Sequence, residues 1–200
     1  MPNNKQKGNN FERDMSRLLS LWWTKGKRDD AIWRSASSGA LATIGKGRYL
    51  AHTGDFTATD AEAAPLFDKV IIEAKRGYSR FSVQDLLDVP ATSRAKNPVY
   101  EMMAKLTEAC STQKKSGLLL WKRDRRDLLV FLITRSHDLI CYIPKIQMIS
   151  GNGHILYGMR WDDFVTISEI CQKLVLGMPV SSSAALPWSP FSGLGGQRPT

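Results

Sequence analysis

The chain has 200 residues, of which 42% are hydrophobic and 24% charged, a composition typical of one globular domain with its own core. Its 28 Lys and Arg against 19 Asp and Glu give a net charge of +9, which favours a polyanionic partner, either nucleic acid or an anionic membrane. The apolar runs are too short to span a membrane, and the 3 cysteines are scattered, which argues against a disulfide framework or a zinc site. We therefore expect a cytoplasmic protein with no membrane partner.

Two terminal segments flank the predicted domain. Residues 1–8 are polar and basic, and we expect them to be mobile. Residues 178–200 are rich in Ser, Pro and Gly and show no sustained periodicity, as in a loosely ordered tail. The domain itself is predicted over residues 9–177.

The periodicity between these segments changes several times. Residues 10–23 place apolar side chains on one side of a helix, whereas residues 31–43 and 49–59 are typical of strands interrupted by glycine. The segment DKVIIEAK is a third strand. This order predicts an α/β fold in which helices flank a mixed central sheet. The elements predicted further along are helices over 82–89, 98–115 and 162–176, a hairpin over 117–134 and a strand over 139–146.

The segment VIIEAK carries two opposite charges inside an apolar run. Because side chains alternate across a strand, Ile71, Glu73 and Lys75 share one face, and charges buried there need a reason. The earlier segment GDFTAT places Asp55 at the start of another strand. If these segments pair, the carboxylates of Asp55 and Glu73 converge and repel unless a cation lies between them. Such oxygen ligands suit Mg²⁺ or Mn²⁺, and metal-assisted phosphodiester hydrolysis needs this combination with a lysine.

Two weaker signals precede this strand, and each has an alternative explanation. Glu12 lies at the edge of the apolar sector of the first helix, where it either faces the site or closes a capping box over residues 9–12. The segment WRSASSGA suits either contacts with phosphate oxygens or a simple turn. The Glu-x-Lys pair itself also occurs by chance on the solvent face of strands.

Taken in order, these signals resemble the PD-(D/E)XK nuclease superfamily, and most closely its small Holliday junction resolvase-like members from archaea and phages. The likeness covers residues 8–135. It implies a restriction-endonuclease-like fold and cleavage of DNA by direct attack of water, with a divalent metal as cofactor.

The resemblance also implies a role for each residue. Asp55 and Glu73 would bind the metal, with the carbonyl oxygen of Ala74 as a further ligand, and Lys75 would position the attacking water. Glu12 would complete the acidic site, directly or through a water. The residues that would touch the scissile or adjacent phosphate are Arg34, Ser37 and Ser38.

The identity of the metal-binding aspartate stays open, because Asp60 and Asp68 also lie between Asp55 and Glu73. We expect Asp55, since GDFTAT reads as a strand and DAEAAP as a loop. Gln113, late in a predicted helix, is either an auxiliary residue of the site or a solvent-facing side chain.

Clustered positive charge outside the site predicts a groove that follows DNA phosphates, although basic loops are also common as solvated surface. The basic segments are residues 24–28, 76–80 and 122–127. The candidate DNA contacts in the last of these are Lys122, Arg123, Arg125 and Arg126.

The sequence therefore predicts a Mg²⁺- or Mn²⁺-dependent DNA endonuclease, selective for Holliday junctions or other branched DNA, in phage or mobile-element DNA processing. It would act in a bacterial or phage-infected cell, and branch specificity goes with a homodimer. The alternatives are an exonuclease or restriction-type endonuclease of the same superfamily, an inactive DNA-binding protein with this fold, and a basic structural protein in which Glu-x-Lys is coincidental.

Overall fold

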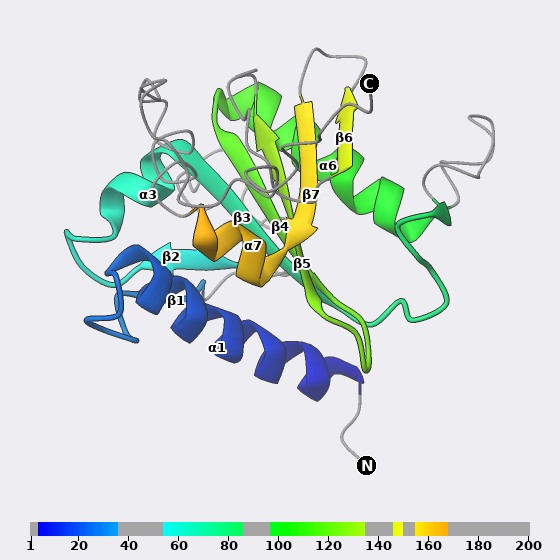
Figure 1. Ribbon diagram of the computed structural model, residues 1–200. Coiled ribbons are helices and arrows are strands. Elements are labelled where there is room, and N and C mark those ends of the chain that lie inside the picture. The colour runs from blue at the N-terminus through cyan, green and yellow to red at the C-terminus, as the bar shows by residue number, and fades with distance from the viewer. Residues whose placement is uncertain (1–3, 36–53, 86–96, 135–145, 150–154, 168–200) are drawn as a thin grey trace, which may run out of the picture.

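The computed structural model describes residues 4–35, 54–85, 97–134, 146–149 and 155–167 (Figure 1). In order, the elements are α1 (Asn4–Trp23), β1 (Ile32–Arg34), β2 (Phe56–Ala58), α3 (Ala64–Lys69), β3 (Val70–Arg76), α6 (Pro98–Gln113), β4 (Ser116–Lys122), β5 (Leu128–Thr134), β6 (Ile146–Ile149), β7 (Ile155–Arg160) and α7 (Trp161–Thr166).

The main sheet has five strands in the order β3-β4-β5-β7-β6. The pair β3 and β4 is parallel and the other neighbours are antiparallel, so the sheet is mixed. The parallel step is made by α6, since parallel neighbours need a crossover connection. Strands β1 and β2 form a separate antiparallel pair. The predicted class, an α/β fold with a mixed central sheet between helices, is confirmed and is compatible with a restriction-endonuclease-like fold.

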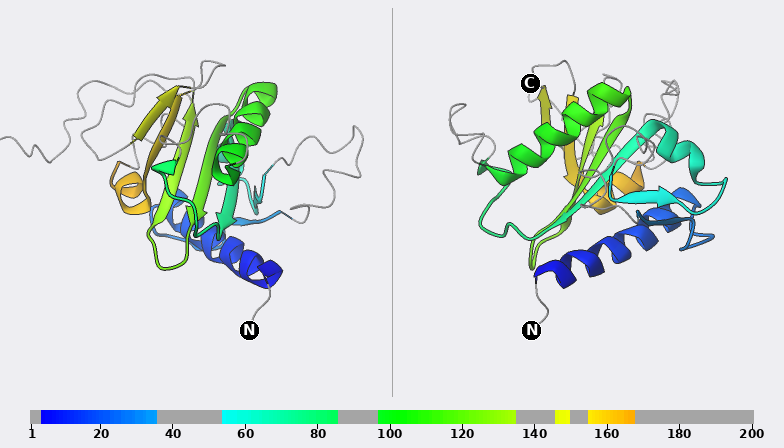
Figure 2. Two further views of the ribbon diagram at one scale, coloured as in Figure 1. Left: turned by 90° about the vertical axis from the view of Figure 1, so that its right-hand side faces the viewer. Right: turned by 180° about the vertical axis from the view of Figure 1, so that it is seen from behind.

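Helices cover both faces of the sheet (Figures 1 and 2). On one face α1 and α7 pack against the sheet, and on the other face α6 does so. Alternation along β3 divides its side chains between the two cores as the sequence predicts: Val70 and Ile72 face α1, and Ile71 faces α6. Strand β3 is buried on both faces, which explains its continuous apolar run.

Helix α1 is longer than its apolar pattern indicates. It begins at Asn4, so residues 4–8, which belong to the polar and basic terminal segment, are helical. Glu12 consequently lies well inside the helix, and the predicted capping box over residues 9–12 is wrong. The buried side of the helix carries Phe11, Met15 and Trp22, as predicted.

Several predicted elements match the structure and others do not. The helix from residue 98 and the hairpin of β4 and β5 are confirmed. Helix α3 was not predicted; it follows the predicted loop at residues 60–63 and takes residues 68 and 69 from the predicted strand. Pro65 lies in its first turn, and Leu66 is buried. Strand β7 was not predicted; its Gly158 leaves room for the Phe131 ring, which would lie 2.8 Å from a Cβ there. The predictions that lie partly or wholly outside the described residues are the strands over 31–43, 49–59 and 139–146, the helices over 82–89 and 162–176, and the tail 178–200.

Candidate active site

The approach of residues 54 and 55 to β3 positions the site. Strand β3 is an edge of the main sheet, and the Asp55 N–H donates to the Ile72 carbonyl at 2.9 Å. Gly54 makes this approach possible, since its φ is +115° and a Cβ would lie 2.8 Å from that carbonyl oxygen. Ser35 holds the same segment on its other side, donating from its N–H to the Asp55 carbonyl at 2.9 Å and from its hydroxyl to the Gly54 carbonyl at 3.0 Å. The Asp55 backbone is thus held between β1 and β3.

Asp55, Glu73 and Lys75 meet at this edge. The carboxylate of Asp55, a residue only 7% exposed, accepts from the Ala74 N–H at 2.8 Å and from the Lys75 ammonium at 2.9 Å. Lys75 also donates to the Glu73 carboxylate at 2.5 Å. The structure therefore brings together the aspartate, glutamate and lysine that the sequence names. One ammonium group bridges two carboxylates.

Burial and charge set the protonation of this group. Burial raises the pKa of Glu73 above its ordinary value, and the charge of Asp55 adds to this, while Lys75 opposes it. Burial lowers the pKa of Lys75, but the carboxylates of Glu73 and Asp55 outweigh burial and raise it above its ordinary value. Lys75 is therefore a firmly held ammonium at neutral pH. In this state it supplies charge and hydrogen bonds rather than acting as a base.

The oxygen atoms at this edge fit a small divalent cation. The N–H and C=O of one strand residue point to the same side; the Ala74 N–H points to Asp55, so the Ala74 carbonyl does too. Two carboxylates and a carbonyl are hard ligands that Mg²⁺ or Mn²⁺ accepts, with water completing the shell. A cation bound there would supply Lewis acidity and an acidified water. Among the residues that the structure describes, no group of three or more His, Cys, Asp or Glu gathers to hold a metal.

Glu12 is held by Arg34 rather than by the residues at the edge of β3. Arg34 Nε donates to the Glu12 carboxylate at 2.5 Å, and Nη2 donates to the Asn9 side chain at 3.1 Å. In the β1–β2 ladder Arg34 lies opposite Phe56, and opposed residues share a face, so Arg34 points with Phe56 toward α1. The adjacent Asp55 turns instead to β3. The ion pair fastens α1 to β1 beside Asp55.

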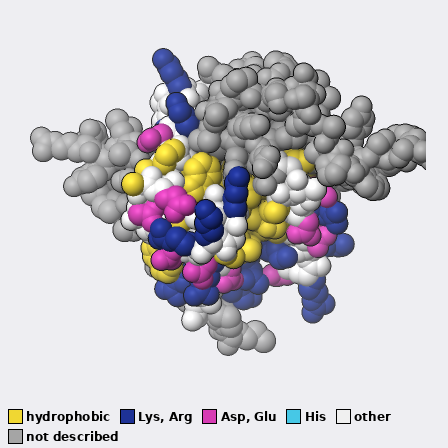
Figure 3. All heavy atoms as spheres, turned by 60° about the vertical axis from the view of Figure 1, so that its left-hand side comes forward, with side chains coloured by type: hydrophobic (Ala, Val, Ile, Leu, Met, Phe, Trp, Pro, Cys, Tyr) yellow, Lys and Arg dark blue, Asp and Glu magenta, His cyan; other side chains and the backbone are white. Residues whose placement is uncertain are grey.

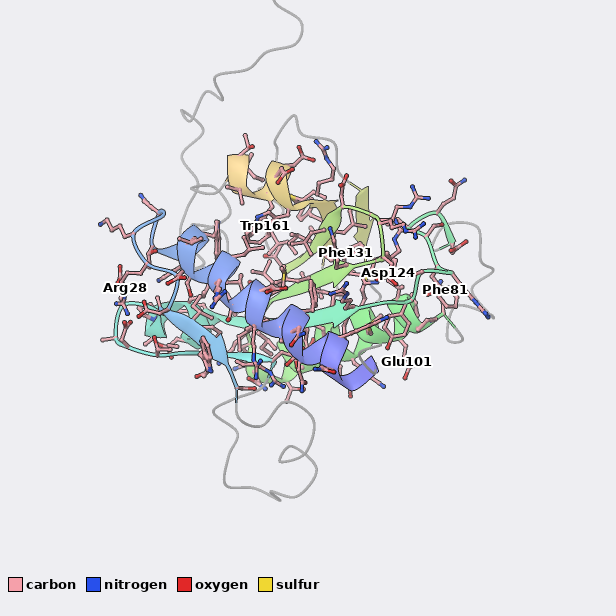
Figure 4. The ribbon with its side chains drawn as sticks, turned by 90° about the horizontal axis from the view of Figure 1, so that it is seen from below. Arg28, Phe81, Glu101, Asp124, Phe131 and Trp161 are labelled. Carbon is pink, nitrogen blue, oxygen red and sulfur yellow. The ribbon has the colours of Figure 1, made fainter. Side chains whose placement is uncertain are left out.

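The rival aspartates lie elsewhere. Asp60 pairs with Arg28 at 2.6 Å, and this contact lowers the pKa of Asp60 below its ordinary value. Asp68 is exposed on α3. Figure 4 shows Arg28 at the opposite end of the molecule from Glu101, which lines the cleft beside Glu73. The geometry favours Asp55 as the aspartate of the site.

A cleft of about 370 Å³ opens between β3 and α6 beside these residues. Glu73 and Lys75 line it together with Ile71 and Leu119 on the sheet, and Tyr78 stands where β3 ends. The residues on the α6 side are Pro98, Glu101, Met102, Lys105, Leu106 and Ala109. A substrate entering this cleft would reach Glu73 and Lys75 directly. Gln113, the last residue of α6, is not among its lining residues.

The residues expected to contact DNA have different surroundings. Ser37 and Ser38 lie outside the described residues, and Arg34 forms the ion pair with Glu12. Arg123 is engaged inside the protein, because Nη1 donates to the Phe81 carbonyl at 2.9 Å and the guanidinium lies 5.0 Å from the centre of the Trp121 ring. Its expected contact with DNA has no support in this geometry.

Arg125 and Arg126 are exposed at the tip of the β4–β5 hairpin, and Lys122 is half-buried at its base. These three remain candidates for phosphate contacts. The face shown in Figure 3, which brings the left-hand side of Figure 1 forward, has Lys and Arg interspersed with Asp and Glu. The net positive charge is therefore not gathered into one patch on that face.

Sequence reasoning missed two residues of the site. Ser35, which holds Gly54 and Asp55, lies in the same RSASSGA segment as the two serines expected to touch phosphate. Its position directly after Arg34, at a strand end, was the available signal. Tyr78 lines the cleft, and the signal for it was an aromatic residue soon after the Glu-x-Lys strand.

Comparison with known families agrees with this geometry. Residues 3–148 match a family described as "Phage putative PDDEXK endonuclease", which is more than half of the chain. The chain therefore belongs to this family. Searches of curated proteins and of solved structures gave no significant match. No helix in the described ranges is long and apolar enough to cross a membrane.

Proposed function

We propose that this member of the phage PDDEXK endonuclease family is a Mg²⁺- or Mn²⁺-dependent DNA endonuclease that hydrolyses phosphodiester bonds at the edge of β3. The observation that carries the proposal is the meeting of Asp55, Glu73 and Lys75, which come from two segments far apart in sequence. A half-buried glutamate and lysine beside a buried aspartate carry a desolvation cost that a stable core does not need. A catalytic role explains their presence.

Each residue has a distinct task in this proposal. The carboxylates of Asp55 and Glu73 and the Ala74 carbonyl hold the cation. Lys75, as an ammonium, orients the attacking water and stabilises the charge that develops on the phosphate. Glu12 acts through Arg34, since their ion pair fixes α1 beside the strand that leads to Ser35.

The preferred substrate that we propose is a Holliday junction or another branched DNA, processed in phage or mobile-element metabolism in the cytoplasm of a bacterial or phage-infected cell. The net charge of +9 supports a nucleic acid partner. Cutting two matched strands of a junction favours a homodimer. Cleavage of labelled junction, flap and linear duplex DNA, with the mass of the protein in solution, tests both points; progressive loss from linear ends would identify an exonuclease instead.

Two substitutions test the proposed activity. Glu73→Ala and Lys75→Ala should abolish Mg²⁺-dependent cleavage while DNA binding, measured by fluorescence anisotropy, persists. Lys69→Ala is the matched control, because Lys69 is an exposed lysine at the end of α3, directly before β3. Metal-dependent cleavage retained by both purified variants at the control level would rule out this site. A wild-type protein that binds DNA but neither Mg²⁺ nor Mn²⁺ would instead be an inactive nuclease-fold binding protein.

A further inference from the structure

An exposed aromatic ring stands at the cleft beside the proposed catalytic residues. Tyr78 lines the same cleft as Glu73 and Lys75 and is 42% exposed. On the α6 side, Lys105 lines the same cleft and forms an ion pair with Glu101 at 2.6 Å. The Tyr78 ring and α6 therefore border one cleft.

The backbone of Tyr78 is held in an unfavourable conformation. Its φ of 58° lies in the left-handed region, which non-glycine residues seldom adopt. If only the shape of the turn mattered, Gly or Asn would adopt it at lower cost. An aromatic residue kept in this conformation next to a reactive site points to a use for its side chain.

Contacts on both sides hold the turn in place. The Gly77 N–H donates to the Lys122 carbonyl at 2.9 Å, and the buried Trp121 indole donates to the Gly77 carbonyl at 3.3 Å. After the tyrosine, the Phe81 N–H donates to the Tyr78 carbonyl at 2.9 Å. The Phe81 carbonyl in turn accepts from a guanidinium on the β4–β5 hairpin. The turn holds the ring in a fixed position, so little conformational entropy is lost when a ligand stacks on the ring.

The size and lining of the cleft favour one nucleobase. Its volume of about 370 Å³ is at the small end for ligand pockets, which suits a single nucleotide and not a length of duplex. Ile71, Met102, Leu106 and Leu119 give it apolar walls, and Glu73 and Lys75 lie on one side where a phosphate would be cut. A base reaches an aromatic ring only when it has left its own stack, as in single strands, bulges and junctions.

We propose that Tyr78 stacks on an unpaired nucleobase next to the bond that is cut, and that the cleft between β3 and α6 holds this one nucleotide. The inference rests on the proposed nuclease activity and specifies its substrate class. It makes Tyr78 a specificity-determining residue: DNA with an unpaired nucleotide at the cut is preferred over fully paired DNA because only an unpaired base can reach the ring.

The test compares two labelled DNAs of one sequence, a duplex with an unpaired bulge and the fully paired duplex. Tyr78→Ala should lower kcat/KM on the bulged DNA by roughly 5- to 100-fold, the range that follows from losing one base–aromatic stack. The value of kcat/KM on the paired DNA should change much less. Tyr78→Phe keeps the ring and should keep the preference. Tyr100→Ala is the matched control. Tyr100 lies on α6 and is 40% exposed, similar to Tyr78, but it does not line the cleft.

Two further measurements separate stacking from folding and from activity itself. Tyr78→Gly should have a melting temperature equal to or above that of the wild type, because glycine adopts φ 58° without strain, yet lose the preference for bulged DNA. With Ca²⁺ in place of Mg²⁺, 2-aminopurine at the unpaired position should be quenched by the wild type and not by Tyr78→Ala. An unchanged bulged-to-paired ratio in Tyr78→Ala, alongside an inactive Glu73→Ala, would overturn the stacking role and leave the nuclease activity standing. Active Glu73→Ala and Lys75→Ala variants would overturn the activity instead.

Discussion

Two clusters of charge in this molecule are built alike but differ in their surroundings. At one end, Arg28 pairs with Asp30, Asp60 and Glu62, each at 3.5 Å or less, and the arginine side chain is 41% exposed. At the edge of β3, Lys75 pairs with Asp55 and Glu73, whose side chains are 10% and 27% exposed. Each cluster places one cation among several carboxylates, and Figure 4 shows Arg28 far from the cleft residue Glu101.

The two clusters differ in how far water hydrates and screens their charges. Around Arg28 solvent screens the charges, so the pairs stabilise a turn and their loss is tolerated. Around Lys75 the charges have lost much of their hydration, so each carboxylate depends on the ammonium or on another cation. Buried charge of this kind is costly for stability and useful for catalysis. The pairing of one cation with carboxylates does not by itself distinguish the two clusters.

The largest expected effect comes from replacing one aspartate of each cluster, Asp55 or Asp60, with asparagine. Asp55→Asn removes a carboxylate from the proposed cation site and should lower the rate of Mg²⁺-dependent DNA cleavage by about 10³-fold or more. Asp60→Asn removes a carboxylate from the exposed cluster and should leave the rate within about a factor of two. Single-turnover cleavage of a labelled junction measures both. Equal losses in the two variants, or a loss confined to Asp60→Asn, would remove the distinction between the clusters.

A second expected effect concerns the backbone that presents Asp55. Gly54→Ala places a Cβ 2.8 Å from the Ile72 carbonyl at a φ of +115°, so it should lower the free energy of unfolding by about 3 kcal/mol and also displace Asp55 and reduce cleavage. Gly26 is the matched control: its φ is +82°, and no other group lies within 4 Å of the position that a Cβ would take there. Gly26→Ala should cost about 1 kcal/mol and leave cleavage intact. Urea denaturation and the cleavage assay check both variants, and a Gly54→Ala protein with wild-type activity would show that the close approach is dispensable.

The sequence predicted the Glu73 end of this site better than its other parts, for a physical reason. Strand alternation is local, so VIIEAK alone indicated that Glu73 and Lys75 share a face. The place of Asp55 depends on one close contact between segments far apart in the chain, and its local signal was the strand-like segment GDFTAT. Glu12 was predicted at the acidic site, but its partner Arg34 comes from strand β1, and helix periodicity says nothing about such a contact.

The same distinction applies to the fold. Long apolar patterns predicted β3, α6 and the β4–β5 hairpin. The short helix α3 and strand β7 were missed, since one helical turn gives little periodicity and a glycine interrupts β7 where the Phe131 ring packs. The contacts of Arg123 with Trp121 and Phe81 could not be predicted either, because they are tertiary contacts.

A third, smaller effect is expected from removing the cation of the buried cluster. Lys75→Met leaves Asp55 and Glu73 close together without their ammonium, so a divalent cation no longer competes with it. Mn²⁺ should then bind about tenfold more tightly than to the wild type, although cleavage is lost. Lys69→Met, at an exposed lysine, should bind Mn²⁺ as the wild type does. Calorimetry gives the affinities, and weaker binding to Lys75→Met would mean that the lysine supports the cation site instead of competing with it.

The smallest expected effect is on the pH dependence of stability, which should have opposite signs for Glu73 and for Asp60. Burial raises the pKa of Glu73 above its ordinary 4.5, so the stability that Glu73 contributes is full below 4.5 and is lost as pH rises through its folded-state pKa. Arg28 lowers the pKa of Asp60 below its ordinary 3.8, so the contribution of Asp60 is present above 3.8 and is lost as pH falls. We compare the free energy of unfolding of the wild type with that of each variant by metal-free urea denaturation between about pH 3 and pH 7. The difference between the wild type and Glu73→Gln should fall as pH rises. The difference between the wild type and Asp60→Asn should rise. Two slopes of the same sign would mean that Lys75 outweighs burial at Glu73, and that the buried cluster behaves electrostatically like the exposed one.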